Sequence, residues 1–294
     1  MSSAQKMRET RGEKIFHVFI VIFLTIFTLL CLLPFINVLS SSFASASELT
    51  TRSFILIPHS FSLNAYKYIL STPTIFKSIG VSLFVMIVGT FISMTLTSFM
   101  AYALSRRYLH GRKVINFLVV FTMLFSGGMI PSFILVQSLG LMDSLWSLIL
   151  PSAVSAYNMI IMRNFFQGIP DSLEESAKMD GCSDWGVFFK IILPLSLPSI
   201  ATISLFYAVS YWNTYQNAIL YINQADKWPI QILLRQIVLV SSGMEADSAA
   251  VDVIPPAQSV KMAVIVIATL PMPIVYPFIQ KYFVKGALIG SVKG

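Results

Sequence analysis

Two groups of residues in this chain have types and spacing that suit a function, and neither has the arrangement of a catalytic site. The first is the segment from Glu175 to Pro194, which reads ESAKMDGCSDWGVFFKIILP. Its small residues and central glycine favour a compact helical loop that can press into a groove on another protein. The second is a polar and aromatic cluster from Tyr207 to Asn217. Aromatic faces, amides and hydroxyls are suited to contacting sugars.

The start of the loop has the composition of a helix N-terminus. Ser172 and Glu175 have the S-x-x-E spacing of a capping box, in which the serine accepts from the Glu175 amide and the glutamate reaches back. Asp171 and Glu174 offer the same pairing one residue earlier. Pro170 stands just outside the predicted helix. A capping box is common, so on this local pattern alone the segment is also compatible with a plain interfacial loop.

The middle of the loop is predicted to end one helix and to begin a second. Gly181 suits the left-handed position that ends a helix. Ser183 or Asp184 can cap a second helix, which we expect to begin at Trp185 and to enter the membrane. Leu173 and Ala177, four residues apart, give the first helix a modest apolar face. The second helix has an amphipathic pattern carried by Val187, Phe188, Ile191 and Ile192.

Composition identifies the elements that must position these groups. The chain has 294 residues, of which 56% are hydrophobic and only 11% charged. Globular domains average about 25% charged residues, so we predict an all-α integral membrane protein. Six segments are apolar enough for a span of about 20 residues, and they contain no Asp, Glu, Lys or Arg. The six predicted spans are 15–39, 79–101, 114–138, 144–162, 191–220 and 262–280.

The distribution of Lys and Arg predicts the orientation, because cytoplasmic loops are enriched in these residues. Fourteen of the 20 flank one side of the predicted spans and six flank the other. Both termini are therefore expected in the cytoplasm, with a tail at 1–14 and a membrane domain at 15–294. The apolar run at 15–39 exceeds the length of a signal-peptide core, which favours an uncleaved first span. The basic residues lie near span ends, so the net charge of +7 does not indicate nucleic-acid binding.

Loops and breaks complete the predicted organisation. A cytoplasmic loop is expected at about 163–190 and a long external loop at about 221–261. Short helices are predicted at 64–70 and 229–240, and an irregular stretch at 241–256. Glycine and proline interrupt three spans, which suits either a bundle that rocks around a path or the ordinary composition of membrane helices. The interrupting residues are Gly127, Gly128, Pro131, Pro194, Pro198, Pro271, Pro273 and Pro277.

The loop pattern, taken whole, resembles the signature of permease subunits in bacterial binding-protein-dependent ABC importers. That pattern is Glu-Ala-Ala, three residues, Gly, nine residues, Ile, one residue and Leu-Pro. This chain departs from it at Ser176, which is also small, and matches it at Glu175, Ala177, Gly181, Ile191, Leu193 and Pro194. Similarity extends over nearly the whole chain, including Pro34-Phe35 and the segment from Trp228 to Arg235. The chain is similar to maltose-permease-like sugar importers, and most to the branch that takes up oligosaccharides from pectin or alginate.

The resemblance implies a type I ABC importer fold and a subunit of a larger machine. It implies a second permease subunit, related but different, two copies of an ABC ATPase that bind ATP and Mg, and an extracytoplasmic binding protein that delivers an oligosaccharide. The chain itself would be a non-catalytic subunit in the bacterial cell membrane that binds no cofactor. The residues expected to couple it to the ATPase are Glu174, Glu175, Ser176, Ala177, Asp180, Gly181, Ile191, Leu193 and Pro194.

The absence of several motifs from the sequence disfavours other classes of protein. The chain has no phosphate-binding G-x-x-x-x-G-K-[ST] motif. No ionisable residue lies inside a predicted span, which disfavours ion-coupled transport. Its two cysteines and three histidines form no metal or disulfide pattern. A channel or facilitator remains the alternative, and it leaves the loop pattern without an explanation.

The cluster on the fifth predicted span is the candidate substrate path. A belt of interfacial aromatics would give the same composition, and this alternative stays open. Because the spans carry no Arg or Lys, a neutral sugar, or contact through the partner subunit, is expected; Lys227 and Arg235 in the external loop are the exceptions. The candidate path residues are Tyr207, Tyr211, Trp212, Asn213, Tyr215 and Asn217.

Overall fold

The structure is a computed structural model, and it describes residues 11–241 and 258–277. Within these residues the chain is helical, and the only extended pairing is an isolated antiparallel bridge between Ala44 and Phe61. The all-α prediction is therefore confirmed for the described part. The chain divides into two compact units, residues 1–69 with 253–267 and residues 70–252 with 268–294.

The first unit is built around a long apolar helix, α1 (Arg11–Ser42). The first predicted span, 15–39, lies inside it. α2 (Ala46–Thr51) follows, and Ser45 caps it by accepting a hydrogen bond from the Glu48 amide at 3.3 Å. α3 (Asn64–Ser71) confirms the short helix predicted at 64–70. Most of α15 (Gln258–Thr269) also belongs to this unit.

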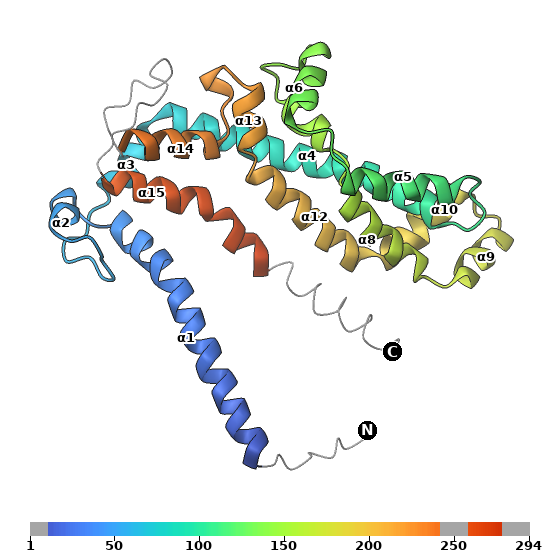
Figure 1. The fold of residues 1–294 in the computed structure, drawn as a ribbon, viewed down its shortest axis with the longest axis horizontal. Helices are drawn as coiled ribbons and strands as arrows, with labels where there is room; N and C mark the ends of the chain where they lie inside the picture. Colours follow the sequence, from blue (N-terminus) through green and yellow to red (C-terminus); the bar gives the residue numbers. More distant parts are fainter. Residues whose placement is uncertain (1–10, 242–257, 278–294) are drawn as a thin grey trace. The chain divides into compact units, whose positions relative to one another are not determined.

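The second unit is organised by α4 (Pro73–Ser105), which begins with a proline in its first turn, a position where the missing amide costs nothing. α8 (Ala156–Gln167) and α12 (Leu197–Trp212) both pack along α4 (Figure 1). The face of α4 turned to them carries small residues such as Ser93 and Thr97. Small side chains allow close approach of membrane helices.

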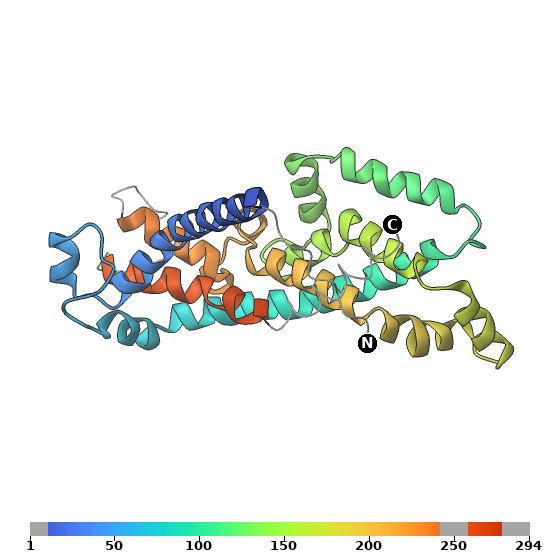
Figure 2. The same cartoon turned by 90° about the horizontal axis from the view of Figure 1, so that it is seen from below.

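The third predicted span is two helices joined by a sharp corner. α5 (Arg112–Leu124) and α6 (Met129–Ser138) meet at an angle of 112° (Figure 2). Gly128 lies at the corner with φ of +90°, a conformation that side chains with a Cβ rarely adopt. The predicted break at Gly127 and Gly128 is confirmed.

The fourth predicted span, 144–162, does not form one continuous helix. The chain there forms α7 (Trp146–Ile149), a 3₁₀ turn at Leu150–Ser152 and then, after an extended Ser155, α8. Pro151 lies in the 3₁₀ turn and lacks the amide that would continue the helical ladder. Ser155 accepts a hydrogen bond from the Asn158 amide at 3.4 Å and so caps the new helix.

The fifth predicted span, 191–220, is also broken. α10 (Asp184–Val187), a π turn (Phe188–Ile192) and α11 (Leu193–Leu195) meet α12 at an angle of 81° around Ser196. Pro198 starts α12 rather than kinking it. The end of the predicted span forms a separate helix, α13 (Gln216–Tyr221).

The segment predicted to be external carries the helix predicted at 229–240, which is α14 (Ile230–Ser241), after a short 3₁₀ turn at Ala225–Lys227. α14 packs on the first half of α4, where the Ile230 amide donates to the Ser82 hydroxyl at 2.8 Å. The sixth predicted span corresponds to an apolar helix at Gln258–Pro277. The predicted irregular stretch at 241–256 and the end of the sixth predicted span lie almost wholly outside the described residues.

By length and composition, three described helices can cross a membrane, and up to five spans result if each bent pair counts as one. Six spans therefore stays a prediction. The apolar helices themselves are as expected, and the breaks lie at proline, glycine and serine residues, where the backbone ladder is weakest.

Candidate functional site: the helical loop between α8 and α12

The loop begins with α9 (Asp171–Met179), and its first turn differs from the prediction. Pro170 is the capping position and makes no side-chain cap. The helix therefore starts at Asp171, two residues before the Ser172 capping box requires and one before the Asp171 box requires. The predicted capping boxes of Ser172 with Glu175 and of Asp171 with Glu174 are both wrong. The carboxylates of Asp171 and Glu174 face the basic residues that directly follow α4 instead.

The end of α9 is as predicted. Gly181 has φ of +84°. The Cys182 amide donates to the Ala177 carbonyl at 2.9 Å and the Gly181 amide to the Lys178 carbonyl at 3.0 Å, the paired bonds of a Schellman turn. The last carbonyls of α9 thus find partners within the chain. The direction of the following segment is set by this turn.

The second helix starts one residue earlier than predicted, at Asp184. Ser183 is its cap and accepts a hydrogen bond from the Gly186 amide at 3.2 Å. The apolar side chains of Val187, Phe188 and Ile192 are buried, whereas Trp185 is exposed. The predicted amphipathic pattern is therefore confirmed for its buried members. Ile191 and Leu193 are half-buried, and Pro194 is exposed within α11.

A buried ion pair ties α9 to the end of α4. Arg106, the first residue after α4, pairs through Nη1 with Oε2 of Glu174. Both side chains are buried, at 6% and 7% exposure. Arg106 also donates from Nη2 to the Phe166 carbonyl at 3.2 Å and lies 4.9 Å above the Tyr102 ring. One arginine thereby joins α4, α8 and α9.

Lys178 extends this pair into a network. Its amine lies 2.9 Å from Oε1 of Glu174 and 2.9 Å from Oδ1 of Asp184. The hydrogen bond that the amine donates to Asp184, together with the one that it donates to Glu174, raises the pKa of the Lys178 amine above its ordinary value. The lysine therefore stays charged and joins α9 to α10. Arg106, Glu174, Lys178 and Asp184 are called the clamp below.

Aromatic packing holds the second helix to α4. The Tyr102 and Phe188 rings lie 4.9 Å apart, and Phe99 contacts Trp185 edge-on with ring centroids at 5.6 Å. The loop is therefore attached to α4 by ionic contacts from α9 and by ring contacts from α10 and the π turn. Figure 1 shows α9 and α10 together at the end of this unit.

The outward face of α9 is opposite the clamp. Glu174 and Ala177 are buried, whereas Glu175 and Ser176 are exposed, and Met179 has 89% exposure. The predicted apolar face of Leu173 and Ala177 is split, because Ala177 packs inward and Leu173 is 43% exposed. Asp180, at the end of the helix, is exposed. A small cavity of about 300 Å³ lies between α9 and the segment after α4, lined by residues that include Arg106, Tyr108 and Lys178.

The cluster predicted as a substrate path separates into two groups. The first is buried in helix contacts. The Tyr207 hydroxyl lies 2.7 Å from Thr97 Oγ1 and accepts from the Ser155 amide at 3.0 Å. The Trp212 indole donates to the Ala268 carbonyl at 2.8 Å. In this structure these polar atoms join helices of the same chain.

Tyr211 belongs to the same buried group. Its hydroxyl lies 2.8 Å from Ser93 Oγ and donates to the Ile149 carbonyl at 3.2 Å. Its ring covers Gly89, where an added Cβ would lie only 2.8 Å from ring atoms. Tyr211 therefore fits against α4 only because residue 89 has no side chain.

The second group is accessible. Asn213 is exposed, and its amide donates to the Val209 carbonyl at 2.8 Å. Tyr215 is half-buried below the Arg235 guanidinium, 5.5 Å from its ring centre. Asn217, also half-buried, donates to the Ser152 hydroxyl at 3.4 Å. The path role of both groups stays a prediction.

Two positions with structural roles were not singled out in the sequence. Arg106 was used only as one of the basic residues that predict the orientation in the membrane. A basic residue directly after a long apolar helix is nevertheless suited to joining that helix to a loop. Asp143 was not among the candidate residues. Its carboxylate accepts from the amides of Asn223 and Gln224, and the Asn223 amide is the main cause that lowers its pKa. The Lys227 amine donates to the Asp143 carbonyl at 2.7 Å.

Comparison with known proteins identifies clear relatives. Residues 93–288 match the family described as binding-protein-dependent transport system inner membrane component. The polygalacturonan/rhamnogalacturonan transport system permease protein YtcP of Bacillus subtilis (strain 168) is 64% identical over 284 residues, covering 96% of this chain and 99% of that protein. Protein LplC of the same organism is 50% identical over the full length of both chains.

A solved structure agrees with these relatives. A chain of a bacterial ABC transporter involved in the import of the acidic polysaccharide alginate superposes with a TM-score of 0.86. It is 33% identical in sequence, and the match covers 94% of this chain and 99% of the other.

Proposed function

This chain belongs to the family of inner-membrane components of binding-protein-dependent transport systems, and we propose that it is the permease subunit of an ABC importer for oligosaccharides. The observation that carries this proposal is the loop between α8 and α12. It presents one face of a short helix outward and is fixed to the long helices by its other face. A passive pore has no use for such an element, whereas a subunit driven by a separate ATPase requires it.

The proposed docking surface on α9 consists of Glu175, Ser176 and Met179. Met179 is the most exposed apolar side chain of the loop, and Ser176 leaves room for close approach. Ile191, Leu193 and Pro194 are proposed to carry the movement into α12. ATP and Mg would bind to two copies of the ATPase, and binding of ATP would favour one of two arrangements of the bundle.

The remaining topology follows from this assignment. The loop must face the cytoplasm, and the basic termini are proposed to lie on the same side. Six spans are proposed, with each bent pair counted as one span and α7–α8 as another. A second, related permease would complete the path. The extracytoplasmic binding protein would dock on the opposite side, where Asp143 holds the loop at Asn223 and Gln224.

For the substrate, we propose an oligosaccharide with uronic acid residues. The relatives support this class, because one is named for polygalacturonan and rhamnogalacturonan and another imports alginate. This proposal departs from the expectation of a neutral sugar. Of the two external cations noted in the sequence, Lys227 is bonded to the Asp143 carbonyl, whereas Arg235 is exposed above Tyr215. Arg235 is therefore proposed to meet a sugar carboxylate, with Asn213 and Asn217 along the path.

The test is uptake by the complex that co-purifies with this chain, reconstituted in vesicles with its binding protein. Oligogalacturonates should accumulate only when ATP is supplied on the side of the membrane that carries the ATPase. A neutral oligosaccharide of equal length should be a poorer substrate. Uptake that needs no ATP and no partner would contradict the permease assignment and favour a facilitator. Equal uptake of both sugars would contradict only the proposed substrate class.

A further inference from the structure

The segment between α2 and α3 carries a group of exposed apolar side chains. Phe54, Leu56, Ile57 and Phe61 are exposed, and Ile57 reaches 79% exposure. They lie in an irregular segment outside the apolar helices, where large apolar side chains exposed together mark an interaction surface. Residues 53–61 are called the apolar hook below.

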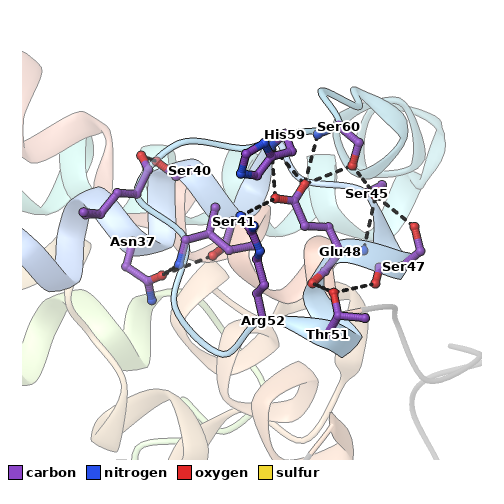
Figure 3. Close-up of polar contacts among 12 residues, drawn as sticks. Asn37, Ser40, Ser41, Ser45, Ser47, Glu48, Thr51, Arg52, His59 and Ser60 are labelled. Carbon is purple, nitrogen blue, oxygen red and sulfur yellow. Dashed lines mark hydrogen bonds and ion pairs between the residues drawn. The ribbon is translucent and has the colours of Figure 1, made fainter.

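The hook has a defined shape, because a single carboxylate organises its end. Glu48 accepts hydrogen bonds from the His59 amide at 3.0 Å, the Ser60 amide at 3.0 Å and the Ser60 hydroxyl at 2.9 Å (Figure 3). The Glu48 side chain is buried at 8% exposure. Ser45 and Ser60 add a hydroxyl contact at 2.5 Å. These bonds hold the backbone at His59 and Ser60 against α2, while Ile57, two residues earlier, remains exposed.

Hydrogen bonds to α1 also fix the position of the hook along that helix. The Ile55 amide donates to Asn37 Oδ1 at 2.8 Å, and the Ser40 hydroxyl donates to the Leu56 carbonyl at 2.6 Å. Asn37 and Ser40 lie at the end of the apolar run of α1, which at about 1.5 Å a residue is about 37 Å long and exceeds the roughly 30 Å of bilayer hydrocarbon. The hook therefore lies beside α1 where that run leaves the membrane.

The hook presents no unpaired carboxylate. Glu48 is the only carboxylate between Phe43 and Leu63, and its oxygens are used inside the segment. The Arg52 guanidinium lies 3.8 Å from the same carboxylate. An exposed apolar face without unpaired acidic charge, held at the membrane boundary, has the properties of an interfacial anchor.

We propose that the apolar hook inserts Leu56 and Ile57 into the headgroup–acyl boundary of the membrane and anchors the external end of α1 there. The anchor fixes the depth of the first unit, since the hydrogen bonds to Asn37 and Ser40 join the hook directly to the helix. This inference rests on α1 crossing the membrane, as the proposed function requires.

The test places a nitrobenzoxadiazole fluorophore on single cysteines of the full chain, within the complex that co-purifies with it. The vesicles contain phosphatidylethanolamine and phosphatidylglycerol, with lipids spin-labelled near the headgroup or deep in the acyl chain. The labelled positions are Ile57→Cys, the matched exposed control Thr50→Cys on α2, and the native Cys31 inside α1. In all three proteins the other native cysteines are replaced by serine.

We expect the label at 57 to be quenched by the headgroup-proximal spin label at least about twofold more than the label at 50, and to be protected from aqueous iodide. Iodide quenching at 57 equal to that at 50 would overturn the proposal. A label at 57 shielded from both quenchers, or shielded from iodide only after the binding protein is added, would also overturn it, because a protein partner would then cover the hook.

The native Cys31 separates failure of the anchor from failure of the architecture. Deep spin labels should quench it, because it lies within the apolar run of α1. If Cys31 is quenched but position 57 is not, only the anchor is wrong. If Cys31 is not quenched, α1 does not cross the membrane and the proposed topology fails together with the anchor.

Discussion

Arg106 and Glu174, 68 residues apart in the chain, form a buried ion pair that joins the end of α4 to the inner face of α9. The pair lies directly behind the surface of α9 that carries Glu175 and Met179. A force applied to that surface therefore reaches α4 through this contact. The same arginine bonds to the Phe166 carbonyl at the end of α8, so two long helices are engaged at once.

Breaking this pair should be costly. Arg106→Gln leaves the Glu174 carboxylate buried without its main partner, and such losses destabilise by about 3–5 kcal/mol. Arg107→Gln is the matched control, because the Arg107 side chain is 87% exposed and lies 3.9 Å from Asp171, a geometry worth at most about 1 kcal/mol. Thermal unfolding of the purified complex compares the two. Equal melting temperatures for both variants would contradict a structural role for the clamp.

Gly181 should tolerate asparagine better than valine. Nothing lies within 4 Å of an added Cβ, so the cost of substitution comes from φ of +84° alone. Left-handed backbone costs an ordinary residue about 1–2 kcal/mol, and Asn is more tolerant than a β-branched residue. Gly181→Val should therefore reduce recovery of the ATPase with the permease, and Gly181→Asn should retain most of it. Normal recovery and transport in the valine variant would count against the turn as a coupling element.

Substitution by alanine should destabilise the protein at Gly89 but not at Gly80. An added Cβ at Gly89 meets the Tyr211 ring at 2.8 Å, whereas at Gly80 it meets nothing within 4 Å. Overpacking of this kind costs about 1–3 kcal/mol. Gly89→Ala should lower the melting temperature of the complex, and Gly80→Ala on the same helix should leave it unchanged. Equal melting temperatures for the two variants would show that the contact between α4 and α12 is looser than described.

Tyr211→Phe distinguishes packing from sugar contact at the same position. The change keeps the ring over Gly89 but removes the hydroxyl that bonds to Ser93 and to the Ile149 carbonyl. If these bonds are its main role, stability should fall by about 1 kcal/mol while the apparent affinity for sugar is retained. A weaker apparent affinity with unchanged stability would instead place Tyr211 on the substrate path.

The segment around Glu48 should loosen in acid. Hydrogen bonds from the backbone amides of His59 and Ser60 lower the pKa of the Glu48 carboxyl below its ordinary value of 4.5. A lowered folded pKa stabilises the segment above the ordinary value, and this contribution is lost as pH falls through the lowered one. The protection of the His59 and Ser60 amides from exchange, relative to the intrinsic rate at each pH, should fall in that range. Glu48→Gln should show low protection already at neutral pH, and protection that does not change with pH in the native protein would refute this account.

Local chemistry explains which features could be predicted from sequence. Gly181 and Ser183 act through bonds to residues within four positions, so their roles as turn and cap are readable from neighbouring residues. The capping box at Ser172 was wrong because the helix starts two residues earlier, directly after Pro170. Such a shift is small in sequence but exchanges every partner in the first turn.

Contacts between distant segments could not be read in this way. Nothing near Arg106 indicates that its partner is Glu174, and nothing near Tyr211 indicates that it covers Gly89. The fourth and fifth predicted spans do not form single helices, because apolarity sets where the chain is buried but not where its backbone ladder breaks. Pro151 and Ser196 illustrate this, since each lies inside a uniformly apolar run that the structure divides.

The most direct test of the central claim is a photo-crosslinking residue at Met179, in cells that contain the complete complex. Met179 should capture the ATPase subunit, and the yield should change when ATP is trapped, because the account places this side chain at the docking surface. Leu135, exposed on α6, is the control and should capture no ATPase. Absence of ATPase capture at Met179, or equal capture at both positions, would contradict the claim that α9 couples this subunit to its energy source.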